Sequence, residues 1–110
     1  MKMICVPLTV EAIKLLDINE CPDALLETAL LTEEEYRQFL NSGALESINY
    51  APGKIIDEYE DEVIKTPEEL RKTLQTLKAH LRPENSKILN KLIQLSALAI
   101  DKNTGLFFFF

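Results

Sequence analysis

Apolar residues recur along the chain at two spacings, one typical of strands and one typical of helices. Residues 4–8 place apolar side chains at every second position, which is the period of a β-strand. Proline has no N–H to donate within a sheet, so Pro7 indicates that this strand lies at a sheet edge or ends there. Thr9 can then be the N-cap of a helix over residues 10–16, where apolar positions recur at helical spacing.

The next two segments also have helical patterns. Residues 19–31 place Pro22 in a first turn, and their apolar face would consist of Leu25, Leu26, Ala29 and Leu30. The segment that follows has a clearer signal, because Thr32 and Glu35 have the spacing of a capping box. Gly43 is placed where it can end that helix.

Residues 44–66 are ambiguous between a hairpin and a helix. Ala-Pro-Gly at 51–53 is a turn signal between residues 45–50 and 54–64, which together would form a long hairpin. Helical spacing is also present in the second arm, at Ile56, Tyr59 and Val63. The apolar pairs at both ends of that arm favour the strand.

Two further helices and a strand are predicted in the second half. Thr66 and Pro67 are typical of a helix start and Pro83 of a helix end; the apolar row between them is Leu70, Leu74, Leu77 and Leu81. A broad apolar face then extends to Ile100, which indicates a largely buried helix. Residues 106–110, Leu-Phe-Phe-Phe-Phe, predict a strand covered on both faces.

These elements predict an α+β fold in one small domain, residues 1–110, with about five helices packed on a small sheet. The sheet is expected to include the N-terminal and C-terminal strands side by side. The alternative is a local hairpin in which residues 97–101 pair with the final strand. A helical pattern that extends to Ile100 favours the first arrangement. A length of 110 residues and an apolar fraction of 46% are enough for one core.

The net charge of the chain excludes some classes of binding partner. The formal net charge is −6, and five of the six residues from Asp57 to Glu62 are acidic. An acidic protein is poorly suited to nucleic acid and to anionic membrane surfaces, so we expect neither as a partner. The two cysteines form no Cys-x-x-Cys pair and no stretch approaches the ~20 apolar residues of a membrane span. We therefore expect a cytoplasmic protein.

The residues that could do chemistry do not form a recognisable set, so we predict no enzyme, cofactor or metal site. The only histidine, His80, lies near a helix end, where the dipole stabilises a cation. Burial would make the thiol of Cys5 unreactive, and Glu20 and Asp23 flank Cys21 and oppose its ionisation. With three glycines in the chain, no phosphate-binding loop is predicted.

The acidic run is the candidate binding site. Its residues are Asp57, Glu58, Tyr59, Glu60, Asp61 and Glu62. Charges of this kind can simply keep a sheet edge from pairing. A run of like charges is also typical of a surface that binds lysine and arginine, with Tyr59 as an aromatic anchor. We therefore predict a small acidic protein-binding module, an inhibitor or immunity-type protein that neutralises a basic partner such as a bacterial toxin nuclease.

The competing hypothesis is a structural or oligomerising subunit. An exposed aromatic strand at residues 106–110 would need a neighbouring chain to cover it. The sequence does not predict an oligomeric state, nor whether Cys5 and Cys21 are bridged.

Overall fold

The structure is a computed structural model that describes residues 2–50 and 61–110. In chain order the elements are β1 (Lys2–Pro7), α1 (Val10–Asp17), the short 3-10 helix η1 (Asp23–Leu25), β2 (Leu26–Leu31), α2 (Glu33–Asn41), α3 (Ala44–Tyr50), β3 (Asp61–Ile64), α4 (Pro67–Ala79), η2 (Pro83–Asn85), α5 (Ser86–Lys102) and β4 (Leu106–Phe109). The predicted α+β class with about five helices is confirmed.

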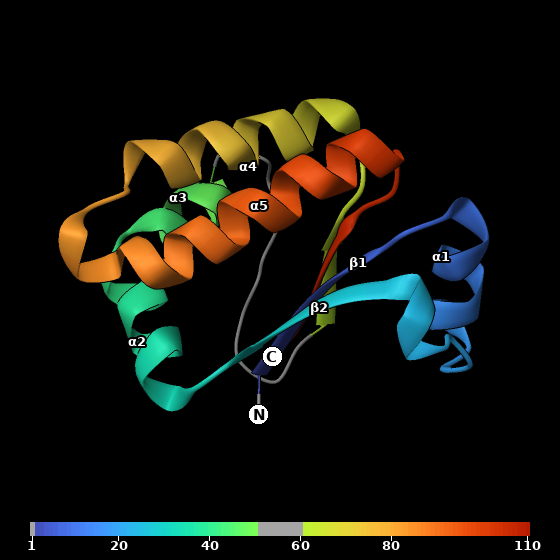
Figure 1. Cartoon of the computed structure of the whole chain (residues 1–110). Coiled ribbons are helices and arrows are strands. Elements are labelled where there is room, and N and C mark those ends of the chain that lie inside the picture. The colour runs from blue at the N-terminus through green and yellow to red at the C-terminus, as the bar shows by residue number, and fades with distance from the viewer. Residues whose placement is uncertain (1, 51–60) are drawn as a thin grey trace.

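The four described strands form one antiparallel sheet in the order β2-β1-β4-β3 (Figure 1). β1 and β4 pair directly, with Cys5 opposite Phe107. The predicted side-by-side placement of the N-terminal and C-terminal strands is therefore confirmed, and the local hairpin is wrong. α5 continues through residues 97–101 as a helix.

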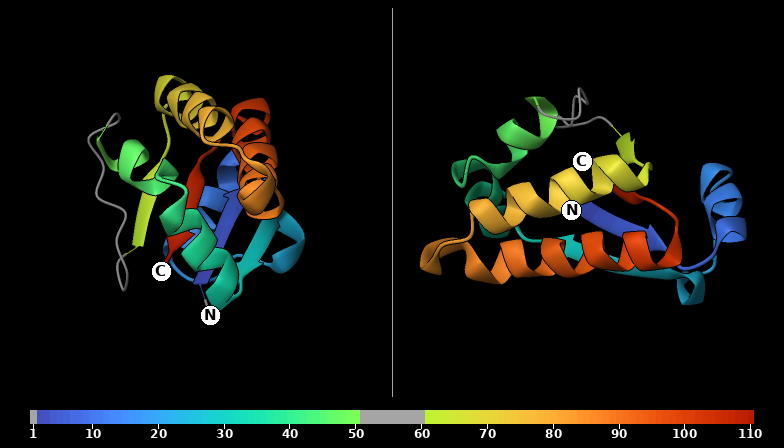
Figure 2. Two further views of the ribbon diagram at one scale, coloured as in Figure 1. Left: turned by 90° about the vertical axis from the view of Figure 1, so that its left-hand side faces the viewer. Right: turned by 90° about the horizontal axis from the view of Figure 1, so that it is seen from above.

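α4 and α5 lie side by side over one face of the sheet (Figure 2). Alternate residues of each strand point to this face, and those of the two central strands, Ile4, Val6, Leu106 and Phe108, are buried in the core with Leu89 and Leu92 of α5. The opposite face of the same strands carries Cys5 and Phe107, which are also buried. The prediction that residues 106–110 are covered on both faces is thus confirmed for Leu106, Phe107 and Phe108, whereas Phe109 and Phe110 are half-buried.

Local signals account for the helix starts. The Thr32 side chain accepts a hydrogen bond from Glu35 N, and the Glu35 side chain accepts one from Thr32 N, which is the predicted capping box. Thr9 and Thr66 cap α1 and α4 in the same way through their side-chain oxygens. Gly43 follows α2 with φ of +81°, a conformation that glycine adopts without strain.

Two predicted elements are wrong. Residues 26–31, predicted as helix, form strand β2 because they pair along their whole length with β1, from Lys2–Leu31 to Pro7–Leu26. Residues 45–50, predicted as a strand, belong to helix α3. The second arm of the predicted hairpin is a strand over Asp61–Ile64, and its earlier residues lie outside the described part of the chain.

Candidate functional site

The structure describes only the last part of the predicted acidic site. Asp57, Glu58, Tyr59 and Glu60 lie outside the described residues. Asp61 begins β3, and Glu62 follows it at a half-buried position. Glu62 is therefore the residue through which the acidic run can be related to its surroundings.

A hollow of about 300 Å³ lies beside Glu62, between the end of α1 and the strands β3 and β4. Its acidic members are Asp17 and Glu62, and its apolar floor includes Val63, Phe107 and Phe109. The two phenylalanine rings are stacked, with centroids 6.3 Å apart and planes inclined by 20°. By strand alternation these rings face away from α4 and α5. The aromatic floor of the hollow therefore lies on the face opposite the helical pair, with Asp17 on that side. Glu62 is opposite Phe108 in the β3–β4 ladder and borders the hollow from the edge of β3, where its Oε1 bonds to Val63 N.

The carboxylate of Glu62 also has a structural role. Its Oε1 accepts a hydrogen bond of 2.9 Å from the backbone N of Val63. In the β3–β4 ladder Val63 is opposite Phe107, and Phe107 directs its own backbone groups toward β1. The Val63 N–H consequently points to the outer edge of β3, where the Glu62 side chain satisfies it. This is one of the ways in which a sheet edge is protected from pairing.

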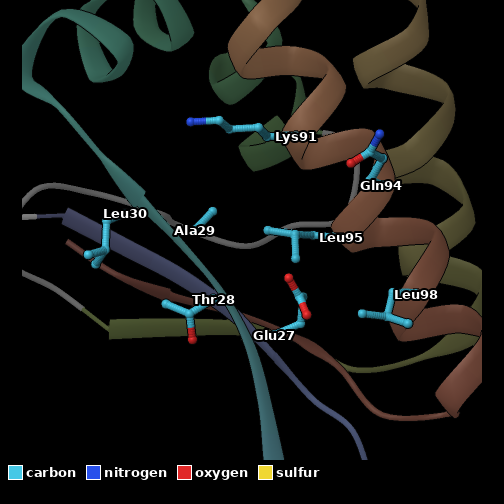
Figure 3. A pocket seen from close by; sticks show the side chains of 8 residues that line it. All are labelled: Glu27, Thr28, Ala29, Leu30, Lys91, Gln94, Leu95 and Leu98. Carbon is cyan, nitrogen blue, oxygen red and sulfur yellow. The ribbon is translucent and has the colours of Figure 1, made fainter. Parts of the chain in front are cut away.

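A second and larger hollow, of about 460 Å³, follows the other edge of the sheet (Figure 3). We call it the β2–α5 groove; its lining residues are Glu27, Thr28, Ala29, Leu30, Lys91, Gln94, Leu95 and Leu98. Figure 3 shows β2 along one side and successive turns of α5 along the other. Sequence reasoning missed this groove because it assigned residues 26–31 to a helix.

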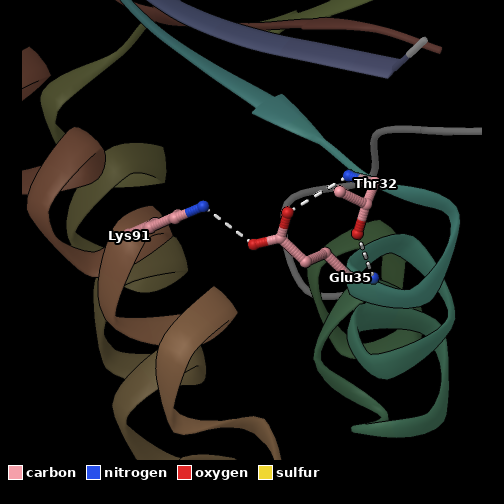
Figure 4. Close-up of polar contacts among 3 residues, drawn as sticks. All are labelled: Thr32, Glu35 and Lys91. Carbon is pink, nitrogen blue, oxygen red and sulfur yellow. Dashed lines mark hydrogen bonds and ion pairs between the residues drawn. The ribbon is translucent and has the colours of Figure 1, made fainter.

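An ion pair stands beside the groove. Lys91 Nζ donates to Glu35 Oε2 at 2.8 Å, while Glu35 Oε1 accepts from Thr32 N at 3.1 Å (Figure 4). The hydrogen bond from Lys91 holds the pKa of the Glu35 carboxyl below its usual range, and burial opposes that effect only in part. The carboxylate therefore joins the start of α2 to the middle of α5 and holds Lys91 in place.

His80 lies at the end of a helix, as the sequence predicted. It is the C-cap residue of α4, and its Nδ1 lies 2.8 Å from the carbonyl oxygen of Thr76. A carbonyl only accepts, so Nδ1 carries a proton and donates it. Nε2 lies 3.5 Å from Ser47 Oγ in a shallow hollow between α3 and α4. Ser47 N–H is bonded to the carbonyl of Gly43, so it does not point freely to the oxyanion that would form on a substrate carbonyl attacked by this serine.

The cysteines are both free thiols. Cys5 is fully buried in β1, and burial, with the nearby Cys21 as a second cause, raises the pKa of its thiol to about 11. This agrees with the expectation that Cys5 is unreactive. Within residues 2–50 and 61–110, no cluster of three histidine, cysteine or acidic side chains has the arrangement of a metal site.

Comparison of the chain with family models, curated proteins and solved structures finds no match. Among the helices that the structure describes, none is long and apolar enough to cross a membrane. From the acidic hollow beside Glu62 and from the β2–α5 groove, with the charges beside them, we infer a function and an interaction surface.

Proposed function

We propose that this chain is a small acidic protein-binding module that receives a basic segment of a partner protein. The observation that carries the proposal is the hollow in which Asp17 and Glu62 stand beside the stacked rings of Phe107 and Phe109. The acidic run ends at Glu62 and so adjoins this hollow in sequence. The proposed surface consists of Asp57–Glu62 together with the hollow.

The hollow matches the two parts of a lysine or arginine side chain. Such side chains lay their aliphatic stems on apolar surface and keep the charged head in a polar environment. A cation over an aromatic ring gains further attraction from the electrons of the ring. The half-buried side chains of Val63 and Phe109 supply apolar surface. Asp17 in the hollow and the Glu62 carboxylate at the edge of β3 supply the negative charge.

The position of Asp17 adds support. Asp17 is the last residue of α1, where the partial negative charge of the helix end disfavours a carboxylate. A negative charge at this position does not stabilise the fold. It would, however, stabilise a bound cation.

The specific form of the proposal is an inhibitor or immunity-type protein that covers the basic cleft of a toxin nuclease. A nuclease binds phosphates with lysine and arginine, and clustered carboxylates attract the same side chains. Such attraction speeds association at low salt.

The test is binding of a fluorescent peptide of alternating arginine and phenylalanine to the wild type and to the double variant Asp17→Asn, Glu62→Gln. We expect the double variant to bind about tenfold more weakly, about 1.4 kcal/mol, and salt to weaken the wild type more than the variant. The amide oxygen introduced by Glu62→Gln can still accept from Val63 N, so the edge contact is retained. The same pair of proteins is then compared for inhibition of any basic nuclease that co-purifies with the wild type.

The matched control is Glu84→Gln with Asp101→Asn, which changes the net charge equally at exposed positions on η2 and α5. The control should bind as the wild type does. Equal weakening in both double variants would show that only the net charge matters and would remove the hollow as the site. Replacement of Asp57, Glu58, Glu60, Asp61 and Glu62 by serine with no change in association rate would contradict the role of the acidic run.

A further inference from the structure

Strand β2 presents an open edge in the described part of the chain. It is the first strand in the order β2-β1-β4-β3, and its six residues pair with β1 on one side. The bond from Leu8 N to Leu25 O, 2.9 Å long, continues this ladder and identifies its hydrogen-bonded pairs. Because these pairs alternate, residues 27, 29 and 31 direct their backbone groups to β1. Residues 26, 28 and 30 direct theirs outward.

Two of the outward N–H groups have no backbone acceptor in the described structure. Leu26 N–H is bonded to the carbonyl of Asp23, whereas Thr28 and Leu30 have no such bond. Proteins usually protect an open edge with a charged side chain, a proline or a bulge. The Glu62 carboxylate serves this purpose on β3, but the outward residues of β2 are Leu26, Thr28 and Leu30, and the Leu30 side chain is 55% exposed.

We propose that β2 pairs antiparallel with β2 of a second copy of this chain, so that two sheets join into one. The two-fold axis passes between Thr28 and Thr28 of the second copy, and Leu30 stands opposite Leu26. In this register the Thr28 backbone groups bond to each other in both directions, and Leu30 N–H donates to the carbonyl of Leu26. The surface is self-complementary, as a two-fold interface requires.

In this register, side chains of the two copies make favourable contacts on both faces of the joined sheet. On one face the exposed Leu30 contacts Leu26 of the second copy, which removes apolar surface from water. On the other face Glu27 stands opposite Ala29 of the second copy, in its β2–α5 groove. Lys91 lines that same groove with a side chain that is 39% exposed. A lysine ammonium has three donors, so Lys91 can bind Glu27 of the second copy while it keeps its bond to Glu35.

The helices leave room for this pairing. α5 packs mainly on β1 and β4, and the β2–α5 groove separates part of α5 from β2 (Figure 3). Two strands β1 separated by a β2 pair are about 14 Å apart, since neighbouring strands are about 4.8 Å apart. Helices in contact are separated by about 8 to 10 Å. The two copies of α5 therefore do not collide, and the two grooves merge into one.

The proposed dimer does not depend on the acidic hollow, which lies between α1, β3 and β4. Its test is the solution mass of the full chain, measured by light scattering over micromolar to millimolar concentrations. We expect twice the mass of one chain at the upper concentrations. Leu30→Lys places a charge in the interface and Thr28→Pro removes an outward N–H, so both should remain monomeric at every concentration.

Leu40→Lys is the matched control, because Leu40 is an exposed leucine on α2, away from the edge; it should dimerise as the wild type does. Hydrogen exchange of the unmodified protein gives a second measurement. The amides of Thr28 and Leu30 should become protected as concentration rises, whereas Ala29, bonded to β1, should be protected throughout. A wild type that is monomeric up to millimolar concentration, or a dimer in which these two amides exchange freely, would overturn the proposal.

Discussion

At the scale of single residues, Glu35 connects local and tertiary structure. Its carboxylate completes the capping box of α2 and also binds Lys91 of α5. These hydrogen bonds lower the pKa of its carboxyl in the folded state. Because its pKa is depressed in the folded state, ionised Glu35 stabilises the fold at pH values above the pKa of a glutamate in the unfolded chain, about 4.3. That contribution is lost as the pH falls through the folded value.

We predict that Glu35→Gln lowers the free energy of unfolding at pH 7 by about 1.5 to 3 kcal/mol, the usual contribution of hydrogen bonds to charged groups. The difference between wild type and variant should shrink as the pH falls from the unfolded pKa, about 4.3, toward the lower folded pKa, because the unfolded wild type then takes up a proton that the folded carboxyl resists. Urea unfolding at pH 7 and at pH 3 measures both effects. Glu34→Gln, at an exposed position in the same turn, should cost no more than about 1 kcal/mol. A constant loss at both pH values would contradict the role of the charge.

At the scale of elements, the sequence predicted those segments whose signals are local. The capping box at Thr32 and Glu35, the Thr66 cap and the long apolar face before Ile100 each depend on residues within a few positions of one another. β2 could not be predicted in this way. Its Leu-Glu-Thr-Ala-Leu-Leu sequence is rich in good helix formers, and only pairing with β1 makes it a strand.

The candidate site could also be predicted only where its residues are close together in the sequence. The acidic run was visible in the sequence, and Glu62 does lie beside a hollow. Asp17 was not identified, because it enters the hollow from α1, 45 positions earlier in the chain. The β2–α5 groove was missed with β2 itself.

The end of the β1–β4 ladder gives a test at this scale. Pro7 is the last residue of β1 and directs its backbone groups toward β4, where it has no N–H to donate. Its carbonyl instead accepts a 2.7 Å hydrogen bond from the buried hydroxyl of Thr104. We predict that Thr104→Val destabilises the fold by about 1 to 3 kcal/mol, because it leaves this buried carbonyl without its partner.

Thr104→Ser is the matched variant, since it keeps the hydroxyl and removes only a methyl group. It should retain most of the stability in thermal or urea unfolding. Equal losses in the two variants would show that packing of the methyl group, and not the hydrogen bond, matters at this position.

At the scale of the whole molecule, β4 holds the sheet together. It lies between β1 and β3, and Leu106, Phe107 and Phe108 are buried. The hypothesis of an oligomerising subunit began from an exposed aromatic strand, and in the structure this strand pairs on both sides within the chain. Among the described strands the open edge is β2 instead, so oligomerisation remains a proposal with a different strand as its interface.

We predict that deletion of residues 106–110 unfolds the protein and does not yield a folded monomer. The deletion removes the strand that joins β3 to β1 and exposes the core beneath α5. Circular dichroism and the urea midpoint measure the effect. Phe108→Ala, a smaller change at the same strand, should cost about 3 to 5 kcal/mol. A truncated chain with the cooperative unfolding of the wild type would contradict the central role of β4.

The central position of β4 also affects how the chain is synthesised. A protein chain leaves the ribosome N-terminus first, at about 5 to 20 residues per second. β1 therefore emerges before its partner on one side, Phe107–Phe109, which follows about a hundred residues later. For those seconds β1 has one unpaired edge, and β3 has no strand to join. Pairing across so long a stretch of chain is slow, so a nascent chain is exposed to the greatest risk of aggregation before residues 106–109 have been made.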